Sequence, residues 1–246
     1  MKIINAGYQI ISPDLDDPEI EKKICKQIEI AGRTCYKSED KITDESAVKF
    51  VRGLVKRGHE AMLEHAGMTV KFIVDRGVSH ELVRHRIASF AQESTRYCNY
   101  SSDKFGNEIT FIEPVFFNDI PKKRKSKIQK ILTMKTFEFD FEPTDHDKQY
   151  ARWYDSCCYS EHDYFTLLEL GMSPQEARCV LTTSLKTEVV MTANMREWRH
   201  FLNLRATGTT GKPHPQMLEV AVPLLNELRL KLPALFDDIS YKEERA

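Results

Sequence analysis

The spacing of apolar residues predicts a mixture of strands and helices along this chain. Residues 3–11 alternate apolar and polar side chains as a strand does, and a second strand is predicted at about 68–74. Apolar residues three and four positions apart predict amphipathic helices over about 18–35 and 44–57. No strict repeat of strand, helix and strand is present, so the pattern by itself predicts only a mixed α and β protein.

The second half of the chain carries clearer boundary signals. One long helix is predicted over about 145–170, and it ends at Gly171 because glycine readily adopts the conformation that terminates helices. Ser173 followed by Pro174 predicts the start of another helix. Further elements are predicted as a helix near 81–88, an extended piece over 90–100, strands at 108–113 and 185–191, and helices that begin near Asn194 and run over 215–232.

A basic cluster follows the predicted strand at 68–74. Residues 84–96 read RHRIASFAQESTR, which places three arginines, a histidine and two serines within thirteen positions. A guanidinium group is a planar fork that matches phosphate oxygens, and serine hydroxyls complete such a shell. On a helix Arg84 and Arg86 would point roughly 200° apart. Either they serve two ligands, or the helix ends early and an extended segment re-aims Arg86. We interpret the cluster as a nucleotide site.

Two other interpretations of the basic residues are weighed against this one. The arginines could belong to an exposed helix and pair with Glu81 and Glu93. The lysine run at 122–127 could be a nucleic-acid patch, but acidic residues follow it closely and no aromatic residue lies between the lysines. A solvated helix start is therefore favoured for that run. A nucleotide hydrolase without redox chemistry is the other alternative, although no histidine stands next to Ser94 to activate it.

Composition limits the remaining possibilities. The 246 residues contain 36 Lys and Arg against 37 Asp and Glu, so affinity for an anion must come from locally arranged arginines. No apolar run approaches the roughly 20 residues of a membrane span, and the start of the chain lacks a signal-peptide pattern, so a cytoplasmic protein without a membrane partner is expected. The six cysteines form no Cys-x-x-Cys pair and are expected to be free thiols.

A metal site is not predicted. His59 and Glu60 begin like a zinc-protease helix, but Leu63 stands where the second histidine should be. His59 and His65 are six residues apart and do not share a helix face.

The basic cluster resembles the signature of the flavin-dependent thymidylate synthases, the ThyX family, in which Arg-His-Arg is followed after seven residues by serine. Upstream, HEAMLEH at 59–65 is similar to the family's His-x-Ser-x-Leu-Glu-His segment. Downstream, Ala177 with Arg178 and the stretch 192–205 resemble the second family block. The resemblance implies one α+β domain over 1–246, with a central antiparallel sheet and flanking helices, and a homotetramer with active sites at subunit interfaces.

The resemblance also implies the chemistry. Family enzymes methylate dUMP to dTMP with methylenetetrahydrofolate as the carbon donor, release tetrahydrofolate, and bind FAD that NADPH reduces. The implied flavin ligands are Ala61, Arg84, His85, Arg86, Gln92, Asn194, Met195, Arg196 and His200. The implied dUMP ligands are Glu81, Leu82, Val83, Arg84, Gln92, Glu93, Ser94, Thr95, Arg96, Arg178 and Arg205, with 92–96 reaching the phosphate from a neighbouring subunit. Arg205 is the implied catalytic residue, because a fixed guanidinium near N3 favours the ionised pyrimidine.

Several positions depart from the family pattern. Family members often have Gln at Glu81, Ser at Ala61, Asn at Ala91 and Glu at Gln92. A carboxylate at Glu81 would repel a phosphate unless it turns away or pairs with an arginine. Ala61 has no hydroxyl and offers a flavin only a backbone contact. None of the departures removes an arginine.

Overall fold

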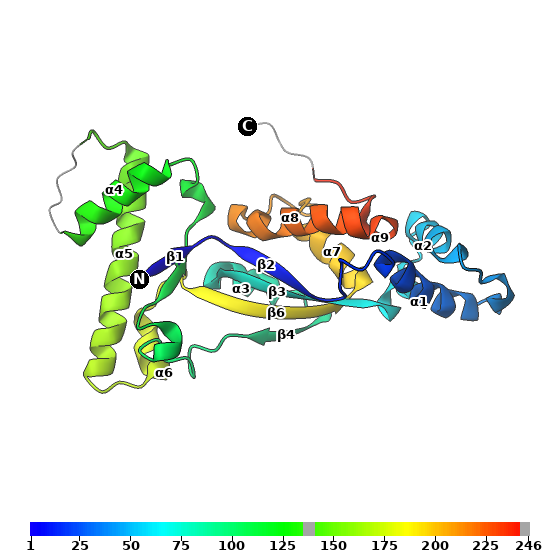
Figure 1. Cartoon of the computed structure of the whole chain (residues 1–246), viewed down its shortest axis with the longest axis horizontal. Helices are drawn as coiled ribbons and strands as arrows, with labels where there is room; N and C mark the ends of the chain where they lie inside the picture. The colour runs from blue at the N-terminus through cyan, green and yellow to red at the C-terminus, as the bar shows by residue number, and fades with distance from the viewer. Residues whose placement is uncertain (135–140, 242–246) are drawn as a thin grey trace. The chain divides into compact units, whose positions relative to one another are not determined.

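The structure is a computed structural model that describes residues 1–134 and 141–241 (Figure 1). Residues 135–140 and 242–246, which the predicted domain 1–246 includes, lie outside the described residues. The chain divides into two compact units. The first unit comprises 1–6, 74–79 and 92–187, and the second comprises 7–73, 80–91 and 188–246. The single domain over the whole chain stays a prediction.

Most residues of a four-stranded sheet belong to the second unit. The strand order is β2 (Gly7–Ser12), β3 (Gly67–Asp75), β6 (Lys186–Asn194) and β4 (Ala88–Gln92). β2 and β3 pair antiparallel, with Tyr8 opposite Phe72. Along β3 and β6 buried side chains alternate with less buried ones, as a period of two requires. The mixed fold with antiparallel pairing is therefore confirmed.

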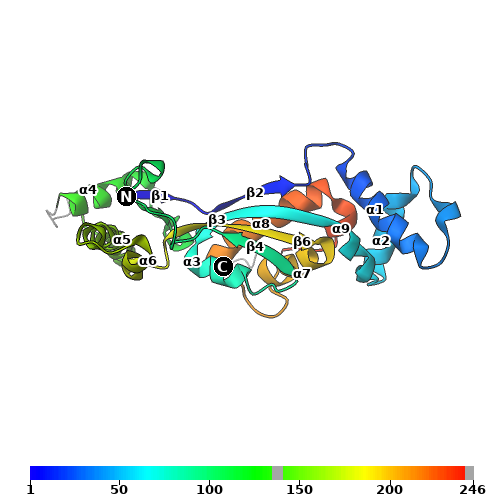
Figure 2. The same cartoon turned by 90° about the horizontal axis from the view of Figure 1, so that it is seen from below.

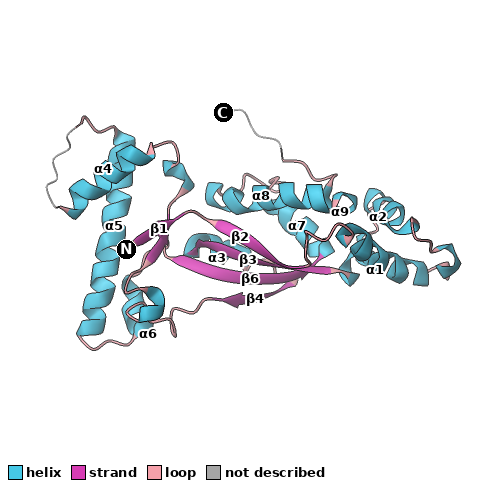
Figure 3. Ribbon diagram, in the orientation of Figure 1, coloured by secondary structure: helices cyan, strands magenta, loops and turns pink. Residues whose placement is uncertain are grey.

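Helices pack on this sheet within the second unit. They are α7 (Met195–Arg205) and α8 (Pro215–Lys231), and the short α9 (Pro233–Phe236) packs against α8 and α2 (Ser46–Lys56) (Figure 3). The indole Nε1 of Trp198 donates a hydrogen bond of 3.0 Å to the backbone oxygen of Met68. Phe72 lies against Trp198 and Phe201, with ring centroids 6.3 and 5.9 Å apart. These contacts fix α7 on β3, and α7 carries most of the predicted residues of the second family block.

Two more helices of the second unit lie side by side in both views, α1 (Ile20–Thr34) and α2 (Ser46–Lys56) (Figures 1 and 2). Both fall inside the ranges predicted from the apolar spacing. A Cβ atom on Gly32 would stand 2.7 Å from the Phe50 ring, so a glycine is needed for this close approach. A 3-10 segment over Glu60–His65 follows α2 and, with His59 before it, makes up the first family block.

The first unit is built around the long helix α5 (Asp145–Glu169). Thr144 and Asp147 form a capping box at its start, and Gly171 after its end has a φ of 94°, as the sequence predicted. Aromatic residues such as Tyr100, Phe111 and Tyr164 form its buried core. Its other elements are β1 (Lys2–Ile4) paired parallel with β5 (Thr110–Ile112), α4 (Lys122–Thr133), α6 (Pro174–Ala177), and 3-10 turns at Asp103–Phe105, Val115–Phe117 and Arg178–Val180. Within the described ranges no helix is both long and apolar enough to span a bilayer.

The predicted helix near 81–88 is wrong in its bounds. Helix α3 runs over Arg76–Leu82 and ends before the Arg-His-Arg triplet. The alternative, an early helix end followed by an extended segment, is confirmed because β4 begins at Ala88. The extended piece predicted over 90–100 ends at Gln92, since the backbone turns back at Ser94, whose oxygen accepts from two later N–H groups.

Candidate active site

The Arg-His-Arg triplet splits its side chains between the protein interior and solvent. His85 is 4% exposed, whereas Arg84 and Arg86 are exposed. In the part of the chain that the structure describes, neither arginine side chain has a hydrogen-bond or ion-pair partner. The two guanidinium groups are therefore available to an anionic ligand.

Both ring nitrogens of His85 are engaged. Nδ1 lies 3.1 Å from Oε1 of Glu197, and Nε2 accepts a hydrogen bond of 3.2 Å from Nε of Arg205. Because a guanidinium only donates, Nε2 must be the acceptor and the proton is on Nδ1, which donates to Glu197. Burial lowers the pKa of His85 and the charge of Arg205 lowers it further, against the opposite effect of Glu197. A neutral imidazole follows.

Glu81 holds the other side of Arg205. Its Oε2 accepts a bond of 2.7 Å from one guanidinium nitrogen, and its backbone oxygen accepts one of 3.2 Å from the other. Pairing with an arginine was one of the two arrangements expected for a carboxylate at this position, and it is confirmed. Arg205 is thus oriented by His85 and by two oxygens of Glu81.

Glu197 is a residue of this cluster that sequence reasoning missed. Its only local signal was its position three residues after the helix start at Asn194. The ligand atoms of His85, Glu197 and His200 lie within 4.8 Å of one another, a spacing that a metal ion would accept. However, both His85 nitrogens already have partners and the Arg205 guanidinium is adjacent, so the local charge opposes a cation. We assign no metal to the group.

The start of α7 lines a cavity of about 390 Å³. The side-chain oxygen of Asn194 caps the helix by accepting from the N–H of Glu197 at 2.9 Å, as expected for this position. Arg196 and His200, predicted to share a helix face, both line this cavity, and Arg196 donates to Glu64 at 2.6 Å. Met195 is fully buried and its N–H donates to Ala66, so any flavin contact there would come from other backbone atoms.

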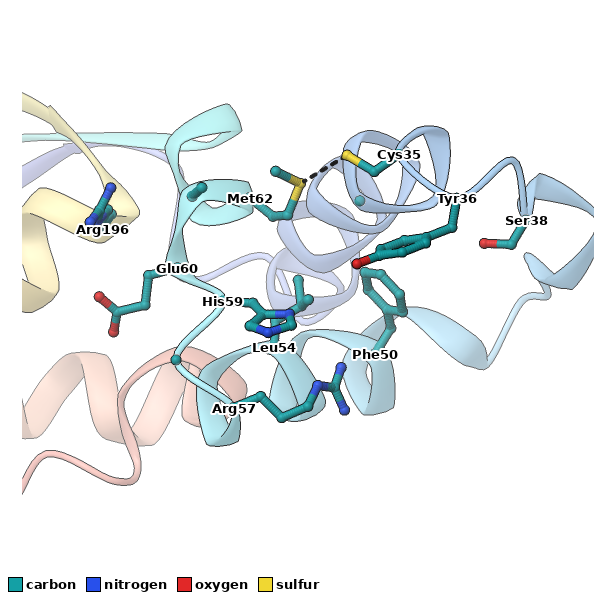
Figure 4. Close-up of a pocket in the computed structure, with 13 residues that line it drawn as sticks. Cys35, Tyr36, Ser38, Phe50, Leu54, Arg57, His59, Glu60, Met62 and Arg196 are labelled. Carbon is teal, nitrogen blue, oxygen red and sulfur yellow. Dashed lines mark hydrogen bonds between the residues drawn. The ribbon is translucent and has the colours of Figure 1, made fainter.

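A second, larger cavity of about 630 Å³ opens beside the 3-10 segment (Figure 4). Its lining includes the predicted residues Ala61 and Arg196. Figure 4 shows Arg196 and Glu60 at one end and Tyr36 at the other. The cavity has the size of a pocket for a drug-sized ligand. Its aromatic and sulfur-containing lining was not foreseen, because Tyr36, Phe50 and Met62 come from three separate elements.

Residues 92–96 and Arg178 of the predicted set lie in the first unit. Gln92 donates to the hydroxyls of Ser79 and Thr187 at 3.0 and 3.2 Å, and Arg178 donates to Oγ1 of Thr95 at 3.0 Å. Glu93 pairs with Lys186 at 2.9 Å, whereas the exposed-helix interpretation expected it to pair with an arginine of the cluster.

The other members of the predicted nucleotide set differ in exposure. Arg96 is exposed beside the ring of Tyr97, and the Ser94 hydroxyl accepts from the Arg96 backbone N–H. Leu82 is fully buried and Val83 is exposed, so Leu82 offers a ligand only its backbone.

The cysteines and the lysine run bear on the alternatives. All six cysteines are free, as expected, and burial raises the pKa of Cys25 and Cys157 to about 12, which makes both poor nucleophiles. In α4, Lys125 forms a buried pair with Glu113, and Arg124 donates to Asp147 at 2.8 Å. Part of the basic run is therefore used within the protein, which favours the helix-start interpretation over a nucleic-acid patch.

Comparison with known proteins identifies the family. A family model described as thymidylate synthase complementing protein matches residues 21–234. The flavin-dependent thymidylate synthase of Corynebacterium aurimucosum is 33% identical over 214 residues, which cover 86% of this chain and 78% of that enzyme. The enzyme of the same name from Geobacter sulfurreducens is 27% identical over 218 residues, covering 86% and 80%.

A solved structure agrees with these relatives in fold. It is the UMP/dUMP methylase PolB from Streptomyces cacaoi bound with 5-Br dUMP, which superposes with a TM-score of 0.65 at 21% identity over 96% of each chain. At this identity the likeness shows a shared fold. From the family match and the identity to its curated members, the chain belongs to the thymidylate synthase complementing protein family, that of the flavin-dependent thymidylate synthases.

Proposed function

We propose that this chain converts dUMP to dTMP, with FAD as its bound cofactor and methylenetetrahydrofolate and NADPH as co-substrates. The names of its relatives and the dUMP methylase that shares its fold support the substrate and the methyl transfer. The folate donor, the release of tetrahydrofolate and the NADPH reductant rest on the family resemblance of residues 59–65, 84–94 and 192–205. We also propose that the fold is the ThyX fold and that the protein is a homotetramer.

The residues present fit a flavin cofactor. The exposed guanidinium groups of Arg84 and Arg86 suit the pyrophosphate of FAD. Asn194, Arg196 and His200 present an amide, a guanidinium and an imidazole at one cavity, which suits the polar edge of an isoalloxazine and its ribityl chain. When bound, the flavin would supply the reducing equivalents that side chains lack.

The observation that carries the proposal is the fixed orientation of Arg205. Neutral His85 accepts from Arg205, and Glu81 holds its two terminal nitrogens, so the guanidinium is positioned before substrate arrives. A guanidinium near N3 of the uracil would stabilise negative charge on the ring and make C5 more nucleophilic. This electrostatic role needs no thiol attack, in keeping with the high pKa of Cys25 and Cys157.

Residues 92–96 and Arg178 would hold the phosphate of dUMP, with 92–96 contributed by a neighbouring subunit. Thr95 and Arg178 already contact each other in the first unit. If active sites combine residues of several subunits, a monomer is inactive. Activity that falls with dilution in parallel with dissociation of the oligomer would support the tetramer.

One incubation tests the proposed function. The purified protein is mixed anaerobically with dUMP, methylenetetrahydrofolate and NADPH, and dTMP is quantified while flavin absorbance is recorded. We expect a yellow protein that bleaches with NADPH and forms dTMP only when all three compounds are present. A colourless protein that cannot be loaded with FAD, or that forms no dTMP after loading, would contradict the proposal. Neither a nucleotide hydrolase nor a nucleic-acid module would be yellow.

A further inference from the structure

Glu197 is a buried acidic residue whose side chain contacts a histidine. Its side-chain Oε1 lies 3.1 Å from Nδ1 of His85, and the residue is 6% exposed. Among the residues that the structure describes, no lysine or arginine forms an ion pair with Glu197. Removing a carboxylate from water costs free energy that a neutral imidazole offsets only in part. The burial of Glu197 beside His85 is therefore not explained by charge pairing.

The place of Glu197 in α7 does not explain its burial either. It lies in the first turn, where a negative charge complements the helix dipole, and Asn194 caps this turn. An exposed side chain fulfils that role as well as a buried one. The carboxylate turns instead toward His85, which lies in the segment between α3 and β4.

Neighbouring rings fix the plane of the His85 imidazole. The Phe201 ring stands edge-on to it, with ring centroids 5.0 Å apart, and the centroid of the His200 ring lies at 5.8 Å. In this orientation Nδ1 faces Glu197 and Nε2 faces Arg205. A carboxylate accepts and a guanidinium donates, so the Nδ1–H tautomer is the neutral form that satisfies both neighbours. The other neutral tautomer would place its N–H against the N–H of Arg205.

His85 and Glu81 hold Arg205 through different nitrogens. His85 accepts from Nε at 3.2 Å, whereas the contacts of Glu81 use the two terminal nitrogens. A uracil that binds a terminal nitrogen can displace the Glu81 carboxylate and still leave the bond at Nε in place. The bond to His85 then keeps the guanidinium oriented while negative charge builds on the pyrimidine.

We propose that Glu197 is a positioning residue for Arg205 and that it acts through His85. By accepting from Nδ1, Glu197 keeps the proton on that nitrogen and leaves the Nε2 lone pair to Arg205. Without this acceptor Nδ1–H would be buried without a partner, so the proton moves to Nε2, where it opposes the guanidinium. The effect on turnover rests on the proposed function, whereas the tautomer can be measured whether or not dTMP is made.

NMR of the purified protein, labelled with ¹⁵N in histidine and arginine, tests the inference directly. We expect wild type to show the Nδ1–H tautomer of His85 and an Nε–H of Arg205 that is protected from solvent exchange. Glu197→Met should shift the tautomer toward Nε2–H and lose that protection. Glu197→Gln keeps a carbonyl acceptor and should resemble wild type. Glu113→Gln is the matched control, because it removes a buried carboxylate, 9% exposed, from its pair with Lys125 in the first unit.

Kinetics then measure the consequence for turnover. Glu197→Met should lower kcat for dTMP formation by about 10-fold, with a smaller change in KM for dUMP, because the arginine acts on charge that builds after binding. Glu197→Gln should recover kcat to within about threefold of wild type. Glu113→Gln should lose thermal stability but keep the wild-type kcat and the wild-type tautomer of His85.

The inference would be overturned by unchanged His85 and Arg205 signals in Glu197→Met, or by a wild-type kcat in that variant. A Glu197→Gln variant as impaired as Glu197→Met would overturn it too. If wild type makes no dTMP, the proposed function fails, and the NMR spectra alone decide the role of Glu197. If Glu197→Met does not fold, Glu197→Asp replaces it, since an acid still suits the helix start but its carboxylate is one methylene too short to reach Nδ1.

Discussion

The pairing of Glu81 with Arg205 predicts that this chain binds its nucleotide less tightly than it would with a neutral residue at 81. A uracil that takes the guanidinium of Arg205 must displace the Glu81 carboxylate, which accepts at 2.7 Å. Replacing Glu81 by Gln keeps the shape of the side chain and leaves the backbone oxygen that also holds Arg205. The substitution therefore removes the competing charge but retains the position of the arginine.

The size of the effect follows from exposure. The Arg205 and Glu81 side chains are 22% and 31% exposed, between a buried pair and a surface pair. Coulomb attraction at an effective dielectric of 20 gives about 4 kcal/mol as an upper bound, and exposed pairs contribute only about 0.2–1 kcal/mol. Between these limits, we expect displacement of the Glu81 carboxylate from Arg205 to cost about 1–2 kcal/mol. This cost corresponds to roughly 5- to 30-fold in affinity for the nucleotide.

Calorimetric titration of the FAD-loaded enzyme with dUMP measures this change. We expect the dissociation constant of Glu81→Gln to fall by about 5- to 30-fold, with a small loss of thermal stability because the ion pair is gone. Glu45→Gln is the control, because it removes the same charge from a carboxylate that forms an exposed pair with Lys22. Weaker or unchanged dUMP binding in Glu81→Gln would show that Glu81 does not compete for Arg205 and would refute the reasoning.

Three further predictions follow from the same structure. Arg205→Ala should keep its flavin absorbance but lose about 100-fold or more in dTMP formation, and full activity would exclude the catalytic role. Because the pKa of His85 is lowered in the folded protein, its neutral imidazole contributes fully to the free energy of unfolding above the ordinary pKa of 6.5. This contribution is lost as the pH falls below 6.5, because the unfolded state then binds a proton that the folded state does not. Denaturation of His85→Gln between pH 7.5 and 5.5 should therefore show a smaller loss of unfolding free energy than wild type; equal losses would contradict this. Gly208→Ala should destabilise the protein by about 1–3 kcal/mol in a denaturant titration, since φ is 73° and the new Cβ would stand 2.8 Å from the oxygen of Gly211; unchanged stability would show that the turn relaxes.

Local signals predicted the elements whose ends are decided by neighbouring residues. The capping box before α5 and the proline at the start of α6 are read from a few adjacent residues. The asparagine cap of α7 is of the same kind. Such signals need no knowledge of distant contacts, and the bounds they predicted agree with the structure.

The early end of α3 could not be predicted in this way. His85 is buried by contacts with Glu197 and Arg205, which lie more than a hundred residues further along the chain. Those contacts decide that the backbone leaves the helix at Leu82, and local helix propensity does not contain them.

At the junction between β6 and α7 a single residue belongs to both elements. Asn194 is both the last residue of the strand and the cap of the helix, and no loop separates them. A single-residue insertion or deletion in β6 would therefore either slip the strand past β3, where Thr69 meets Thr192 at 3.0 Å, or rotate α7 by about 100°. Either outcome would carry Arg196, His200 and Arg205 away together. Evolution of this chain can exchange side chains along the segment far more readily than it can change its length.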